Sequence, residues 1–158
     1  MIVIYHDVGG CHSSATAANI HINRLPMNRT PNIEEIMALP TFDNIEKSDK
    51  GKLIYIGDDE FGAQVYTLGR RRKANFVIPA ICDLYRLTTG SLKGLFLADT
   101  SPSVNNTMRI GGVSSRVLGL VSFGRPIVAK GTIKAYSDIV EIVRKTKEYM
   151  KQNLEVRD

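Results

Sequence analysis

The sequence of 158 residues has no tryptophan, two cysteines and three histidines. It also lacks any apolar run near the roughly 20 residues that cross a bilayer. Two cysteines are too few for a disulfide framework, which favours a reducing compartment. The opening residues, MIVIYHDVGG, lack the basic start and the small-residue cleavage site of a signal peptide. We therefore expect a cytoplasmic protein that is not bound to a membrane.

The overall composition is that of a globular protein. Hydrophobic residues make up 43% of the chain and charged residues 23%, which argues against disorder and against a coiled coil. The length suits one domain spanning residues 1–158. A net charge of +5 permits an anionic partner but does not identify one.

Strand-like and helix-like segments alternate along the chain. Short apolar runs predict strands, at 2–5, 53–56, 63–68, 94–99 and 126–129. Helical spacing, caps and prolines predict helices, starting at 13 and closed by Pro26, from 30 to before 40, at 76–87, near 107–119, and from 137 onward. We expect the helix at 76–87 to be mostly buried, with Cys82 an inert core residue.

This alternation predicts an α/β fold, a three-layer sandwich with a mainly parallel sheet of the P-loop or Rossmann kind. Residues 53–68 would form a β-hairpin at one edge. Ligands of such folds bind at the carboxyl ends of the strands. The loops after residues 5 and 98 are therefore the candidate sites.

The first candidate site is the glycine-rich loop 6–14, which has the sequence HDVGGCHSS. Its glycines allow close backbone approach, and the following helix start favours an anion. The residues that we expect to bind a phosphate are Gly9, Gly10, Cys11, Ser13 and Ser14. His12 would act as a charge partner, an acid–base group or a phosphoryl acceptor.

Two alternatives to simple phosphate binding are disfavoured at this loop. It resembles a Walker A loop loosely, because His6 and Cys11 stand where that motif has glycines and His12 where it has lysine. A cysteine phosphatase would have arginine six residues after the cysteine, and position 17 is alanine. A structural glycine turn that binds no ligand remains open as the other interpretation.

We expect no metal ligands in this loop, although His6, Asp7, Cys11 and His12 are able to bind metals, because no zinc-site spacing is present. His21, on the helix that follows, is interpreted as a packed helix residue.

The second candidate site follows the strand that ends at Asp99. If this strand neighbours the first one, Asp99 faces the glycine loop, where it could hold Mg²⁺ or orient His12. Arg109 or Arg116 could then bind phosphate. Mg²⁺ is the one candidate cofactor, and a loop capped by its own polar side chains is the competing interpretation.

The tightest basic run is Arg70–Lys73. It lies outside any recognisable nucleic-acid-binding module, so nucleic acid is not the expected partner. A solvated strand end, a clamp on a phosphate and an interaction surface are the three open interpretations.

The loop also carries a family resemblance through the pattern H-x-x-G-G-x-H-S-S. Its positions, with the end of the predicted helix, are His6, Gly9, Gly10, His12, Ser13, Ser14, Leu25 and Pro26. The sequence resembles an uncharacterised single-domain family of endospore-forming Gram-positive bacteria. That resemblance implies a single domain and supplies no activity.

The sequence thus predicts a protein of unknown function that binds a phosphorylated small molecule or a nucleotide at loop 6–14. Phosphoryl transfer is an extension of this hypothesis, and whether the protein is an enzyme stays open. The alternative is a non-enzymatic regulatory or interaction protein that uses the basic patch 70–73.

Overall fold

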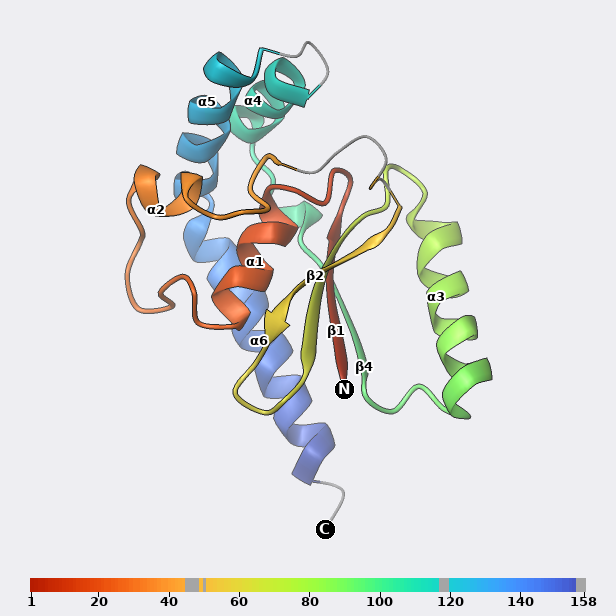
Figure 1. The fold of residues 1–158 in the computed structure, drawn as a ribbon. Coiled ribbons are helices and arrows are strands. Elements are labelled where there is room, and N and C mark those ends of the chain that lie inside the picture. The colour runs from red at the N-terminus through yellow and green to blue at the C-terminus, as the bar shows by residue number, and fades with distance from the viewer. Residues whose placement is uncertain (45–48, 50, 117–119, 156–158) are drawn as a thin grey trace.

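The computed structural model describes residues 1–44, 49, 51–116 and 120–155. Over these residues the chain is a mixed α/β protein with a four-stranded, mostly parallel open sheet and six α-helices (Figure 1). No helix in this part of the chain combines the length and the apolar character needed to cross a bilayer.

The sheet has the strand order β2-β3-β1-β4. Its strands are β1 (Ile2–Asp7), β2 (Leu53–Asp58), β3 (Gln64–Gly69) and β4 (Leu95–Asp99). Strand β1 is parallel to both β3 and β4, whereas β2 is antiparallel to β3. The predicted edge hairpin is confirmed. The first strand pairs with the strand that ends at Asp99, which is the condition on which the second candidate site depends.

The register of the sheet brings three strand ends together. His6 of β1 lies opposite Leu68 of β3 on one side and Asp99 of β4 on the other. Because all three strands are parallel, the loops that follow them emerge at the same end of the sheet, where the strands have their carboxyl ends. Both candidate sites therefore lie at the carboxyl end of the parallel strands.

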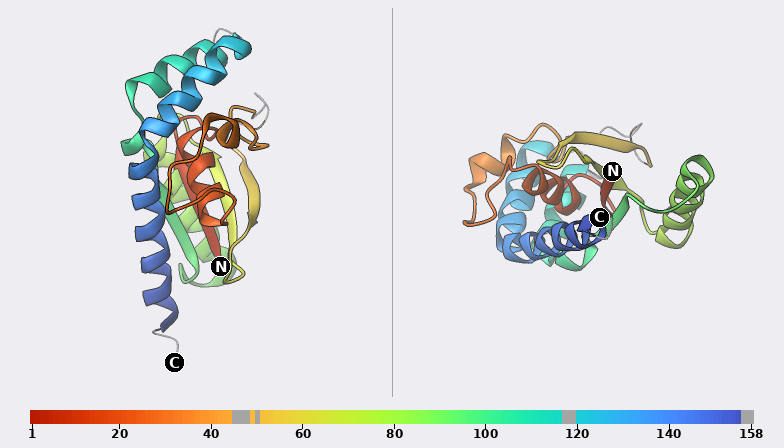
Figure 2. Two further views of the ribbon diagram at one scale, coloured as in Figure 1. Left: turned by 90° about the vertical axis from the view of Figure 1, so that its left-hand side faces the viewer. Right: turned by 90° about the horizontal axis from the view of Figure 1, so that it is seen from below.

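The helices differ in how closely they contact the sheet. They are α1 (Ser13–His21), α2 (Ile33–Met37), α3 (Ala74–Thr89), α4 (Asn106–Arg116), α5 (Val121–Lys134) and α6 (Tyr136–Glu155), with a short 3-10 turn, η2 (Ser101–Ser103), before α4. Helices α1 and α6 lie side by side against one face of the sheet (Figure 2). Val3 and Tyr5 of β1 pack there with Ala17 and Ile20 of α1 and Ile139 of α6, all fully buried.

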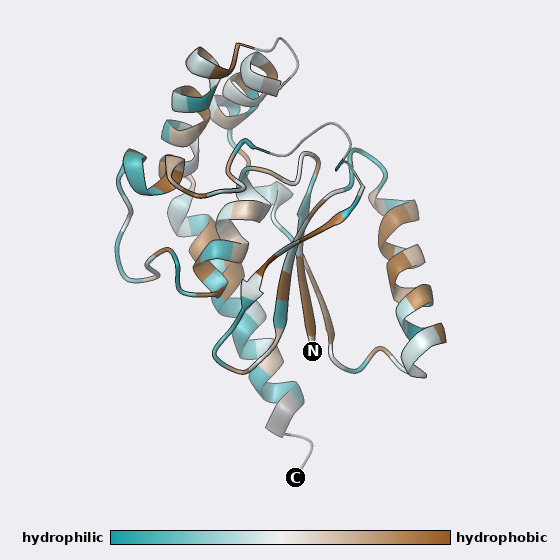
Figure 3. Cartoon of the chain, in the orientation of Figure 1, coloured by the Kyte–Doolittle hydropathy of each residue, from teal (hydrophilic) through white to brown (hydrophobic). Residues whose placement is uncertain are grey.

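Helix α3 stands on the opposite side of the sheet from α1 and α6 (Figures 1 and 2). The expectation that it is mostly buried is wrong, because none of its residues is buried, and Phe76 and Leu87 are 73% and 84% exposed. Its apolar residues, brown in Figure 3, run along the helix. Cys82 is accordingly half-buried rather than part of the core. Apolar composition indicates that a helix can be buried, but not that a partner surface lies beside it.

The strand predicted at 126–129 is also wrong, since these residues belong to α5. A run of four apolar residues fits either element, and here the packing against α4 decides. A Cβ on Gly111 of α4 would lie 2.4 Å from the backbone nitrogen of Val128. The two helices therefore approach backbone to backbone, which a strand at this place would not permit.

Several helix ends differ from their predicted positions. Helix α1 begins at Ser13 but has His12 at its N-cap, and it ends at His21, before Pro26. Helix α2 starts after Asn32, which forms a capping box with Glu35, instead of at Thr30. Helix α6 starts at Tyr136, one residue before the predicted cap.

Candidate functional site

The turn that follows β1 is organised around the carboxylate of Asp7. Its Oδ1 accepts hydrogen bonds from the backbone N–H groups of Gly9 (2.8 Å) and Gly10. Its Oδ2 accepts from the Ser13 hydroxyl (2.6 Å) and the Ser14 N–H (3.3 Å). The donors that the sequence assigned to a phosphate are thus bonded to a carboxylate of the chain itself.

The turn also packs tightly against the end of β3. Gly10 has φ +79°, and a Cβ on it would lie 2.4 Å from the backbone nitrogen of Gly69. The Thr67 hydroxyl lies 2.9 Å from the Gly10 carbonyl oxygen and 2.8 Å from the Ser14 hydroxyl. Close packing therefore accounts for glycine at position 10 without a ligand.

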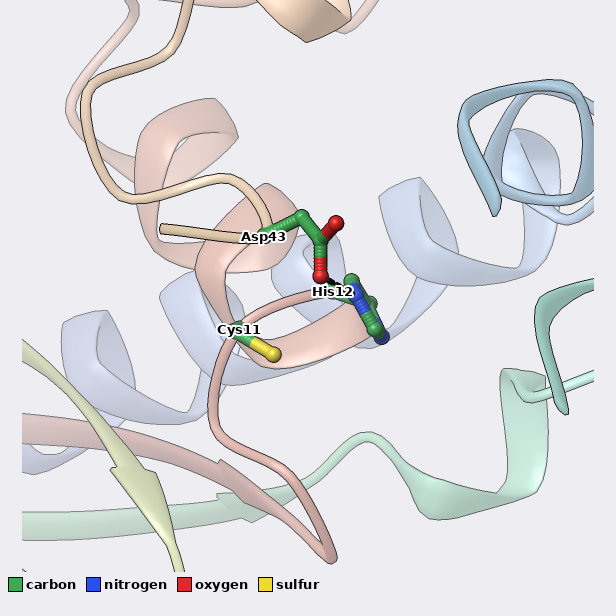
Figure 4. Close-up of side chains that lie close together, drawn as sticks. All are labelled: Cys11, His12 and Asp43. Carbon is green, nitrogen blue, oxygen red and sulfur yellow. Dashed lines mark hydrogen bonds and ion pairs between the residues drawn. The ribbon is translucent and has the colours of Figure 1, made fainter. Parts of the chain in front are cut away.

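Beyond this turn, Cys11 and His12 meet Asp43, which comes from the segment after α2 (Figure 4). The His12 Nε2 lies 2.9 Å from the Asp43 Oδ1. One ligand-type atom of each of the three residues lies within 4.8 Å of the other two. We call Cys11, His12 and Asp43 the Cys–His–Asp cluster.

Several contacts hold Asp43 in this position. Its backbone, with φ +52°, donates a hydrogen bond from N–H to the Cys11 carbonyl oxygen at 3.0 Å. The Ser115 hydroxyl of α4 donates to its Oδ2. The side chain of Asp43 is fully buried, whereas that of His12 is 14% exposed. The cluster is therefore accessible to solvent on the His12 side.

The electrostatic setting of His12 favours its charged form. Burial opposes the charge, but the Cys11 sulfur and the Asp43 carboxylate outweigh it and raise the pKa of His12 to about 10. The Phe42 ring packs beside the imidazole, with centroids 5.6 Å apart.

Helix α4 forms the neighbouring wall of the cluster. A Cβ on Gly112 would lie 3.1 Å from the His12 Cε1. Arg109 is exposed and precedes Gly112 by three residues, which places it about one turn away on the same side of α4. The helix spacing therefore places Arg109 about one turn from the part of α4 that lies against His12.

The second candidate site is built around Arg70, which is 7% exposed. Its Nε donates to the His6 Nδ1 at 2.9 Å, and its Nη2 lies 2.8 Å from the Asp99 Oδ2 and 3.0 Å from the Ser101 hydroxyl. Arg70 thus ties the ends of β1, β3 and β4 together. The basic run 70–73 is therefore not one surface patch, because Arg70 is buried whereas the three residues after it are exposed.

The surroundings of this second group lower the pKa values of both His6 and Asp99. Burial lowers the pKa of His6, and the nearby Arg70 charge adds to that effect while Asp99 opposes it. Burial alone would raise the pKa of Asp99, but hydrogen bonds from Ser101 and the Arg70 charge hold it below its usual value. Asp99, the candidate Mg²⁺ ligand, is therefore an ion-pair partner of Arg70. The carboxylate that pairs with His12 is Asp43.

His21 lies apart from both groups, in the core. Its Nδ1 is 2.7 Å from the Tyr5 hydroxyl and its Nε2 is 3.0 Å from the Asp59 Oδ2. Burial lowers its pKa, although the bond to Asp59 opposes this. The prediction of a packed helix residue is confirmed.

Sequence reasoning did not identify Asp43, Ser115 or the role of Asp7. Asp43 follows the helix predicted to end before residue 40, and the apolar Phe42 next to it, which is buried, was the available signal that the chain turns toward the core here. Ser115 is 72 residues away from Asp43, so no local spacing links them.

The fold and these groups define a mixed α/β protein with a Cys–His–Asp cluster at the end of its first strand. A family model described as "Protein of unknown function (DUF3189)" matches residues 2–148, and the chain belongs to this family. The resemblance to an uncharacterised family is thereby confirmed. Comparison with curated proteins and with solved structures gives no match.

Proposed function

We propose that the protein binds a phosphorylated small molecule or a nucleotide beside loop 6–14, on the outer side of His12. The observation that carries this proposal is the placement of a partly exposed imidazole next to the α4 turn that bears Arg109. His12 also stands at the N-cap of α1, where the helix dipole favours an anion. Imidazole and guanidinium groups together suit a phosphate.

The remaining loop residues have a supporting role in this proposal. Gly9, Gly10, Ser13 and Ser14 hold Asp7 and shape the turn, so they position Cys11 and His12 instead of contacting the phosphate. Asp43 orients the imidazole ring by its hydrogen bond with the His12 Nε2. Phosphoryl transfer would use the same ligand position, with His12 nearest to the transferred group.

Isothermal titration calorimetry with inorganic phosphate, AMP and ATP tests the proposal. Arg109→Ala should weaken binding about tenfold, which corresponds to about 1.4 kcal/mol, because a charge-assisted contact to phosphate is lost. Arg144→Ala is the matched control, since Arg144 is exposed on α6 and bonded to Glu141. His12→Gln should remove binding while the circular dichroism spectrum is retained. The proposal fails if none of the probes binds, or if Arg109→Ala and Arg144→Ala behave alike.

A second candidate function, interaction through the basic patch, is favoured by a different observation. Arg71, Arg72 and Lys73 are exposed directly before α3, on which Phe76, Leu84 and Leu87 are also exposed. A regulatory or interaction protein would use these two features as one surface. Replacing the three basic residues with glutamine should then lower the salt concentration that elutes the protein from heparin. Unchanged elution would exclude this use of the patch.

A further inference from the structure

We infer that Cys11, His12 and Asp43 form a binding site for one divalent metal ion of the zinc class. The cluster offers a thiol sulfur, an imidazole nitrogen and a carboxylate oxygen, all within 4.8 Å of one another. Zinc takes these three donor types in proteins, whereas magnesium prefers oxygen ligands alone.

The spacing of the three atoms suits an ion after small side-chain rotations. Ligand atoms around tetrahedral zinc lie roughly 3.3–3.7 Å apart, given metal–ligand bonds of about 2.0–2.3 Å. The His12 Nε2 and the Asp43 Oδ1 are 2.9 Å apart, so an ion would replace the proton between them and separate them slightly. The backbone need not move, because the segments that carry the ligands are already adjacent (Figure 4).

Hydrogen bonds outside the cluster hold its members in place. The Asp43 N–H donates to the Cys11 carbonyl oxygen at 3.0 Å, which ties the two ligand-bearing segments together. The Ser115 hydroxyl donates to the Asp43 Oδ2, leaving the Oδ1 directed at His12. Outer partners of this kind orient the ligands of metal sites.

Three protein ligands leave one coordination position for an exogenous group. Of the three ligands, the His12 side chain is the partly exposed one, at 14%, and it lies next to α4, so that position would be shared with the proposed phosphate site. The inference therefore rests on the proposed function for the identity of the fourth ligand. Metal binding itself is measurable with no phosphate present.

Titration of the full-length, metal-free protein with cobalt(II) tests the inference. Cobalt occupies zinc sites and gives an intense thiolate-to-cobalt absorption when a cysteine sulfur is a ligand. We expect one cobalt per chain with this absorption, displaced by zinc. Cys11→Ser should abolish the absorption, and Ser115→Ala should weaken cobalt binding roughly 10- to 100-fold by freeing Asp43.

Cys82→Ser is the matched control, because Cys82 is the other free cysteine and lies on α3. It should leave both the absorption and the affinity unchanged. If cobalt does not bind, or if the absorption persists in Cys11→Ser and disappears in Cys82→Ser, the inference is overturned. Should Cys11→Ser fail to fold, His12→Gln decides in its place, because a metal site must lose cobalt affinity when this ligand is removed.

The outcomes separate this inference from the proposed function. Cobalt binding without binding of phosphate or nucleotide would support the metal site and contradict the phosphate proposal. Phosphate binding by a chain that takes up no metal would do the reverse.

Discussion

At the scale of single residues, Asp7 determines the form of the first loop. A carboxylate within the turn accepts the bonds that an external anion would otherwise accept, from two glycine amides, a serine hydroxyl and a helix-start amide. Gly10 and Ser14 are buried, so their amides would lose a buried acceptor without Asp7, which is itself 4% exposed.

Asp7→Ala should therefore lower the free energy of unfolding by about 3 kcal/mol, since several buried donors lose their acceptor. Asp83→Ala is the control, because Asp83 is an exposed partner of Arg86 on α3, and its loss should cost less than about 1 kcal/mol. Urea denaturation of the three proteins measures both values. Equal stability of the two variants would show that Asp7 does not organise the turn.

Gly10 offers a second test at the same scale. Gly10→Ala should destabilise the protein by at least about 2 kcal/mol more than Gly62→Ala. Both glycines have positive φ, +79° and +74°, so both variants incur the same backbone strain. A Cβ at Gly10 would lie 2.4 Å from the Gly69 nitrogen, whereas one at Gly62 has no atom within 4 Å. Similar denaturation midpoints for the two variants would exclude the close contact.

At the scale of elements, the four strands and most helices were predictable, whereas helix α5 and the exposure of helix α3 were not. Continuous apolar runs next to turn residues located β1, β4 and the hairpin, because buried strands leave that pattern in any context. The run at 126–129 has the same character but lies in α5, where Gly111 and Gly131 allow close contact with α4. The difference comes from packing between segments, which local periodicity does not contain.

The exposure of helix α3 can be tested by substitution. Leu87→Ala should change the free energy of unfolding by less than about 0.5 kcal/mol, because Leu87 is 84% exposed. Ile139→Ala in α6, where the side chain is fully buried, should cost about 2–5 kcal/mol. Thermal and urea denaturation of the two variants measure the contrast. A large loss in Leu87→Ala would mean that α3 is packed in solution.

At the scale of the whole molecule, the buried histidines govern how stability responds to acid. His21 is fully buried and its pKa is lowered, so the unfolded chain binds a proton more readily than the folded chain. The stabilisation is complete above the unfolded value near 6.5 and is lost as the pH falls from there through the folded value. His6, whose pKa is also lowered, acts in the same direction. His12 acts in the opposite direction, because its pKa is raised to about 10, and it partly offsets the other two near pH 6.5.

We therefore expect the free energy of unfolding to decline as the pH is lowered from 7 to about 5. The free energy of unfolding of His21→Gln should decline less steeply, because glutamine does not titrate. Its amide can still form hydrogen bonds with Tyr5 and Asp59. Urea denaturation across this pH range measures the slopes. Parallel curves for wild type and variant would contradict the neutral, buried state of His21.

The candidate site was predictable in part, for reasons that lie in the assembly of the whole chain. Loop 6–14 could be located because it follows the first strand, and His12 because it begins a helix there. Asp43 contacts His12, and Ser115 contacts Asp43, although the three residues are far apart in the sequence. No spacing in the sequence therefore predicts these contacts.

The proposed site places a phosphate beside His12 and Arg109 and not within the glycine turn. Amide chemical-shift mapping of the ¹⁵N-labelled protein during titration with inorganic phosphate and ATP tests it most directly. We expect shifts at residues 11–13 and 109–112, with little change at the Gly9 and Gly10 amides, because these stay bonded to Asp7. Large shifts at Gly9 and Gly10, or shifts confined to residues 71–73, would contradict it.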